Sequence, residues 1–146
     1  MNLLLKEFWE WFSMNEIDYA EKSSCGNFEK EEFFFPKFHE MISNVELTLE
    51  KKHFTDEEIE NVLTIMALDN EGENVLDMLI NKLSDEMTEK FAIEGIHHIQ
   101  PNARWQIAVL IGRKRIRNCS YFLNMLANDD DEYVRQRAKN ELNYMS

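Results

Sequence analysis

The chain has 146 residues, a length that fits one domain, and hydrophobic residues make up 44% of it, which excludes wholesale disorder. Its 4 glycines and 2 prolines are too few for the turns of an all-β sandwich or barrel, so the composition favours helices. The net charge of −12 is uneven, because residues 1–100 carry 8 basic and 23 acidic side chains, whereas residues 101–146 carry 8 basic and 5 acidic ones. The resulting net charge of −15 on residues 1–100 argues against binding nucleic acid or an anionic membrane. It would attract a basic protein, although solubility alone would also explain it.

Two isolated cysteines, Cys25 and Cys119, do not form a disulfide framework, which favours a reducing compartment. The leucines at residues 3–5 are followed at once by Lys6 and Glu7, so they do not form a signal peptide. No apolar run approaches the roughly 18 residues of a membrane span. We therefore expect a cytoplasmic protein with no membrane partner.

The first predicted helix covers about residues 3–21, where apolar residues recur at helical spacing and form a stripe along one face. Glu16 is the one polar residue in this stripe. Residues 23–27 predict a loop. Pro36 is expected to begin a helix that runs to about Lys51. The three phenylalanines just before it, Phe33–Phe35, are expected to be buried in the core.

The remaining chain carries clear helix boundaries. Thr55 and Glu58 have the spacing of a capping box, Ser84 is a candidate N-cap, and Pro101 is expected to open a helix that Gly112 closes at its C′ position. The chain therefore predicts about eight helices joined by short loops, the later ones covering roughly residues 55–68, 73–83, 85–98, 101–112, 118–127 and 131–145.

An internal repeat occurs near the C-terminus, where residues 102–111 align with residues 133–142 at an offset of 31. The alignment matches Arg104 with Arg135, and Ile107 with the small residue Ala138. Residues 122–138, with a Leu-rich helix, an Asp-rich turn and then Val-Arg, closely resemble a HEAT-like repeat.

The resemblance covers about residues 85–146 and implies antiparallel helix pairs stacked as a short α-solenoid. It gives a structural role to Arg104 and Arg135, which are expected to pair with Asp129 or Asp131 of the Asp-rich turn. We expect an all-α single domain, in which residues 55–146 form HEAT-like repeats and residues 1–54 a divergent helical cap.

Two other features of the sequence could form a functional site. The Glu-x-x-His spacing of di-metal bundles occurs twice, in Glu50 with His53 and in Glu94 with His97. Glu50 and His53, however, lie at a predicted helix end beside two lysines. We therefore expect these to be surface residues, and we expect no metal or other cofactor. The basic run at residues 113–117 is expected to form a loop that caps the carbonyl end of the preceding helix and faces the acidic part of the chain. A phosphate-binding patch, as in HEAT-like DNA glycosylases, is the alternative.

The segment Phe8–Glu16 resembles the opening helix of several small bacterial proteins associated with polymorphic toxin systems, in which immunity proteins are common. Trp9 is expected to be buried, whereas Trp11 lies off the apolar stripe and is expected to be exposed and to suit an interface.

Together these features predict a non-enzymatic protein-binding module, an immunity protein that blocks a basic toxin domain of the nuclease type, with no small-molecule substrate and with nucleic acid an unlikely partner. A HEAT-like adaptor or assembly factor is the first alternative, and a glycosylase-like enzyme is the second. The residues expected to bind the partner are Trp11 and an acidic cluster of Glu57, Glu60, Asp69, Glu71, Glu73 and Asp77.

Overall fold

The computed structural model describes residues 1–23 and 31–145, and over these residues the chain forms nine α-helices, one short 3₁₀ helix and no strand. The all-α fold is therefore confirmed. The predicted loop at residues 23–27 lies, apart from Ser23, outside the described residues. The elements are α1 (Asn2–Phe12), α2 (Glu16–Lys22), η2 (Glu31–Phe34), α3 (Phe38–Leu49), α4 (Asp56–Leu68), α5 (Asn74–Lys82), α6 (Asp85–Gly95), α7 (Pro101–Lys114), α8 (Cys119–Leu126) and α9 (Glu132–Met145).

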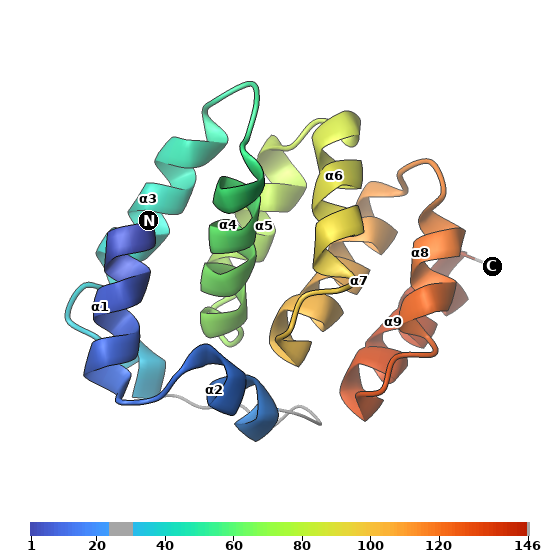
Figure 1. The fold of residues 1–146 in the computed structure, drawn as a ribbon. Helices are drawn as coiled ribbons and strands as arrows, with labels where there is room; N and C mark the ends of the chain where they lie inside the picture. Colours follow the sequence, from blue (N-terminus) through green and yellow to red (C-terminus); the bar gives the residue numbers. More distant parts are fainter. Residues whose placement is uncertain (24–30, 146) are drawn as a thin grey trace.

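The helices stand side by side in two rows (Figure 1). α4, α6 and α8 form the nearer row, and α5, α7 and α9 lie behind them. α1 and α3 lie at one end of the rows, and α2 runs beneath the lower end of α4. α7 is the central element, since it contacts α4, α5, α6, α8 and α9.

The central position of α7 explains why every residue from Pro101 to Gly112 is buried. A helix that is enclosed on all sides needs partners for its polar side chains. Trp105 Nε1 donates to Asn102 Oδ1 (3.1 Å), and Gln106 Nε2 donates to the backbone carbonyl of Met66 on α4 (2.8 Å). The first bond lies within α7, and the second joins α7 to α4.

The single helix predicted over residues 3–21 is wrong, because the chain forms α1 and α2 with a sharp turn between them. Ser13 adopts a left-handed conformation (φ 59°) and ends α1, and the Asn15 side chain accepts from the backbone N–H of Asp18 and caps α2. The turn places Glu16, the one polar residue of the predicted apolar stripe, in the first turn of α2, where its side chain contacts Thr64 of α4.

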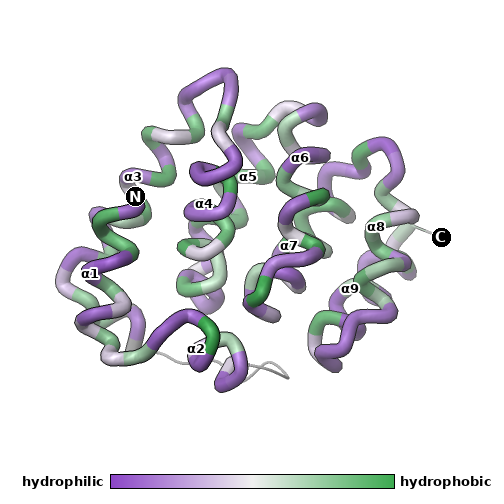
Figure 2. Tube along the Cα trace, viewed as in Figure 1, coloured by the Kyte–Doolittle hydropathy of each residue, from purple (hydrophilic) through white to green (hydrophobic). Residues whose placement is uncertain are grey.

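Other boundaries follow the local signals. Thr55 and Glu58 form the predicted capping box, Ser84 caps α6, and Pro101 occupies the first turn of α7. Figure 2 shows the hydrophilic turn between α3 and α4 that precedes Thr55. Gly112 does not end its helix, because α7 continues to Lys114 and a left-handed Arg115 caps it.

Gly112 instead permits close helix packing. A Cβ atom at this position would lie 2.4 Å from Glu141 Oε2 and 2.9 Å from Glu141 Cβ on α9. The predicted burial of the phenylalanines before α3 is only partly right, because Phe35 is buried but Phe34 is 75% exposed. The Phe33 side chain lies outside the part that the structure describes.

Candidate partner-binding surface and pocket

The acidic residues predicted to form one cluster fall into two separate groups. Glu57 and Glu60 lie in the first two turns of α4, whereas Glu71, Glu73 and Asp77 surround the start of α5. The two groups are separated by the length of α4, about 20 Å. Glu57, Glu60, Glu71 and Asp77 are exposed, and Glu73 is half-buried.

Asp69 is not part of this surface, because it is fully buried in the turn after α4. Its Oδ2 accepts from the backbone N–H of Val75 (2.9 Å), and its Oδ1 accepts from Asn74 Nδ2 (3.3 Å). Burial raises the pKa of Asp69 to about 6. Asp69 therefore stabilises the α4–α5 turn from within, and it does not lie on the surface that a partner could contact.

The indole of Trp11 is 41% exposed, as its place off the apolar stripe predicted. Its ring contacts Phe35 at 5.5 Å and Phe8 at 6.1 Å between centroids, so one side of the indole is packed. Trp9, which was expected to be buried, is only partly so and lines a pocket. A role for Trp11 in partner binding stays a prediction.

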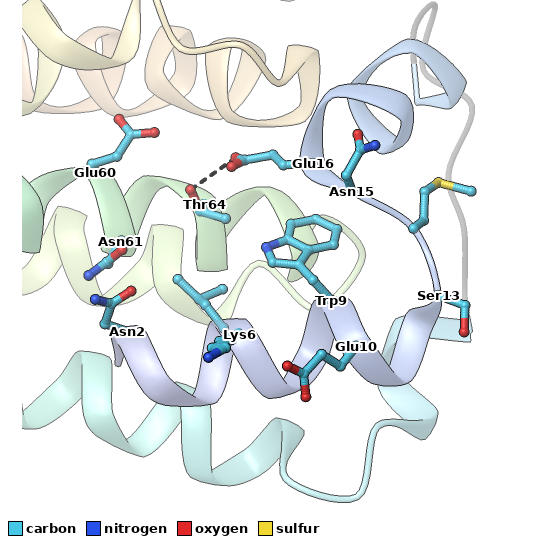
Figure 3. Close-up of a pocket in the computed structure, with 12 residues that line it drawn as sticks. Asn2, Lys6, Trp9, Glu10, Ser13, Asn15, Glu16, Glu60, Asn61 and Thr64 are labelled. Atoms are coloured by element: carbon cyan, nitrogen blue, oxygen red, sulfur yellow. Dashed lines mark hydrogen bonds between the residues drawn. The ribbon is translucent and has the colours of Figure 1, made fainter.

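The pocket lies between α1, α2 and α4 and has a volume of about 690 Å³ (Figure 3). Leu5 and Trp9 of α1 form an apolar wall. Glu16 of α2, with Glu60 and Thr64 of α4, supplies the polar groups. Figure 3 shows the Trp9 indole standing between α1 and the side chains of Glu16 and Thr64.

A hydrogen-bond network holds the carboxylates of this pocket. Glu16 Oε1 accepts from Thr64 Oγ1 (3.2 Å) and from Gln100 Nε2 (3.1 Å). Glu60 Oε1 lies 3.0 Å from Nε2 of His98, whose side chain is fully buried. The hydrogen bond from His98 is the main reason that the pKa of Glu60 lies below its usual value. Both carboxylates are thus anchored by groups that enter from the α6–α7 loop.

Glu16, Glu60 and His98 place one potential ligand atom each within 4.8 Å of one another, which is a spacing that a metal ion can use. The tautomer of His98, however, is unfavourable for binding a metal ion at Nε2. The backbone N–H of Gln100 donates to His98 Nδ1 (3.0 Å), so Nδ1 carries the lone pair and Nε2 carries the proton. A metal on Nε2 would need the proton on Nδ1, where it would face the N–H of Gln100. The donor set therefore fits a hydrogen-bonded network better than a metal centre.

The Glu-x-x-His pairs identified in the sequence do not belong to the group formed by Glu16, Glu60 and His98. Glu50, His53, Glu94 and His97 are all exposed.

The first two residues of the basic run, Arg113 and Lys114, end α7, and Lys114 Nζ donates to the backbone carbonyl of Leu83 at the end of α5 (2.8 Å). The run was expected to cap the helix that precedes it. That end of α7 is closed by the backbone of the left-handed Arg115, while the Lys114 side chain caps α5 instead.

The arginines of the internal repeat bind the Asp-rich turn in two different ways. Arg104 is largely buried and binds Asp129 with both arms of its guanidinium (2.9 and 3.1 Å). It also contacts Asp130 Oδ1 (3.2 Å) and donates to the backbone carbonyl of His98 (2.7 Å). Arg104 therefore links the α6–α7 loop to the α8–α9 turn.

Arg135 was expected to pair with an acidic side chain, but its Nη1 donates to the backbone carbonyl of Asp129 (2.8 Å). Asp131 Oδ1 accepts from the backbone N–H groups of Tyr133 (2.9 Å) and Val134 (3.1 Å), which caps α9. The repeat thus organises its turn mainly through backbone groups and Arg104.

No protein-family model, curated protein or solved structure matches the chain. Among the described residues, no helix has the length and apolar character that crossing a membrane requires. The pocket geometry is therefore the main guide to function.

The sequence predicted Glu60 as a partner-binding residue, but it did not indicate the other polar residues that shape this pocket. Glu16, Thr64 and His98 belong to three distant segments, and their spacing in the chain gives no motif. The one available signal was Glu16 itself, because a carboxylate in an apolar helical stripe needs a polar partner when the helix is packed.

Proposed function

We propose that this protein is a non-enzymatic binding module for a cationic protein, and specifically an immunity protein that blocks a basic nuclease-type toxin domain. The observation that carries the proposal is the concave pocket on the strongly acidic part of the chain, where two anchored carboxylates adjoin an aromatic wall. A nuclease binds phosphates through a cationic active site, so an acidic surface complements it and speeds association.

The architecture we propose is a short HEAT-like α-solenoid of antiparallel pairs, α4–α5, α6–α7 and α8–α9, behind a divergent cap of residues 1–54. Contacts within each pair, and contacts of α7 with α5 and α9, support this arrangement. The bond of Arg104 to Asp129 supports it further, because it joins one pair to the next. Such stacks offer extended surfaces for binding other proteins.

An adaptor that joins two proteins is the second candidate function. It is favoured by exposed apolar side chains at the C-terminal end, away from the acidic pocket. Tyr121 is 63% exposed, Met125 follows it by one helical turn, and Tyr144 is 74% exposed on α9. Exposed aromatic and methionine side chains are enriched at protein interfaces.

Affinity capture with the immobilised chain tests the proposal. We expect a captured protein with a pI above about 9 that is released when salt rises from about 50 to about 500 mM. The captured protein is then purified, and its nuclease activity is measured with and without an equimolar amount of this chain. Stoichiometric inhibition supports the immunity role, and unchanged activity with tight binding favours the adaptor. Capture of only acidic proteins, insensitive to salt, contradicts both the charge argument and the proposed partner.

A further inference from the structure

We infer that the pocket between α1, α2 and α4 binds the side chain of one arginine from the cationic partner, with the guanidinium held between Glu16 and Glu60. This inference rests on the proposed function and names the point at which the partner is anchored.

The charge of the pocket is unbalanced. Carboxylate oxygens of Glu16 and Glu60 lie within 4.8 Å of each other, and in the part of the chain that the structure describes neither pairs with a lysine or arginine. The imidazole of His98 does not line the pocket; its Nε2 contacts Glu60 Oε1, and its Nδ1 accepts from the backbone N–H of Gln100. Two like charges at this separation repel each other, and a cation between them removes that cost.

The hydrogen bonds in the network leave acceptor capacity on both carboxylates. Glu16 uses Oε1 for Thr64 and Gln100, and Glu60 uses Oε1 for His98. Within residues 1–23 and 31–145, no hydrogen bond reaches the Oε2 atom of either side chain. The site is rich in acceptors, so it is suited to a ligand that only donates.

The walls favour arginine over a small inorganic cation. Leu5 and the Trp9 indole offer an apolar surface for an aliphatic stem, and the indole face attracts a guanidinium by stacking and by the cation–π interaction. A volume of about 690 Å³ accommodates an entire side chain with part of its backbone. The planar guanidinium fork reaches two carboxylates at once, whereas an ammonium group is a point charge. The tautomer of His98 opposes a metal ion at the same place.

The test uses N-acetyl-L-arginine methylamide as the probe and follows the indole N–H signal of Trp9 by NMR at about 20 mM salt. We expect a saturable shift of that signal, and binding of the corresponding lysine derivative weaker by about threefold or more. The double variant Glu16→Gln with Glu60→Gln keeps every acceptor oxygen used in the network but removes both charges. It should weaken the arginine probe by about tenfold or more.

The matched control is Glu50→Gln with Glu94→Gln, which makes the same change in net charge on exposed residues outside the pocket. It should leave the affinity for the probe within about twofold of the original. A second variant, Asn61→Arg, places a guanidinium on the pocket wall from the chain itself and should abolish probe binding even if the double variant does not fold.

Absence of a saturable shift, or equal weakening by the pocket and control variants, overturns the inference. The proposed function fails separately. If a basic protein still binds and the pocket variants do not affect it, the arginine site is wrong and the binding function stands. If the probe binds but no basic protein does, the site stands and the proposed function is wrong.

Discussion

Replacing Arg104 with alanine should destabilise the fold more than any other single change in the repeat region. The guanidinium makes five hydrogen bonds, two of them to the Asp129 carboxylate and two to backbone carbonyls of the α6–α7 loop. Only 11% of the Arg104 side chain and 10% of the Asp129 side chain are exposed. Alanine therefore leaves a nearly buried carboxylate and two carbonyls without their main donor.

The expected loss is about 3 kcal/mol of unfolding free energy, near the lower end of the range for breaking a buried ion pair. The lower end applies because Asp129 still accepts from the backbone N–H of Asp131 (2.9 Å). For a domain of this size that loss lowers Tm by about 10 °C. Urea unfolding followed by circular dichroism measures the free energy, and a thermal melt measures Tm.

Arg135→Ala is the matched control, because Arg135 is only partly buried and donates to the backbone carbonyl of Asp129. Its loss should cost about 1–2 kcal/mol. Arg104→Lys should recover little of the stability, since an ammonium group does not reproduce the two-armed contact. Equal effects of Arg104→Ala and Arg135→Ala, or no change in Tm for Arg104→Ala, would refute the reasoning.

Three further predictions concern packing, pH and metals. Gly112→Ala should cost about 1–3 kcal/mol, because the new Cβ meets Glu141, and an unchanged urea midpoint would count against this close contact. Burial raises the pKa of Asp69 to about 6, so the native state takes up this proton before the unfolded chain does. When the pH is lowered from 7 to 4, the unfolding free energy of the original chain should therefore rise by about 2–3 kcal/mol relative to that of Asp69→Asn. Urea unfolding measures both free energies against pH, and parallel profiles for the two chains would contradict this prediction. Adding Zn²⁺ or Mn²⁺ to about 1 mM should shift Tm by less than about 1 °C, because the tautomer of His98 opposes a metal, and a larger rise with stoichiometric metal in elemental analysis would overturn this.

Local signals were enough to predict most helix boundaries. The capping residues Thr55 and Ser84 and the proline at residue 101 act within one turn of their own position, so their effect is readable from neighbouring residues. The break at Ser13 was missed because the apolar stripe continues across it. A left-handed serine is set by the packing of α1 and α2 and has no signature of its own.

Properties that depend on distant contacts were not predictable. Asp69 and Glu71 look alike in the sequence, yet Asp69 turns inward to bind the start of α5 and Glu71 is exposed. Gly112 resembled a helix end, although its role is set by Glu141 on another helix. The pocket carboxylates Glu16 and Glu60 meet only because the turn at Ser13 directs α2 towards α4.

The association rate constant of the captured basic protein, measured against ionic strength, tests the central claim most directly. The original chain is compared with the Glu16→Gln, Glu60→Gln double variant from about 20 to about 300 mM salt. We predict that the association rate of the original chain falls by about tenfold or more over this range, and that the variant associates more slowly with a shallower dependence on salt. An association rate that does not change with salt, and is the same for both chains, would contradict the account of an acidic surface that captures a cationic partner.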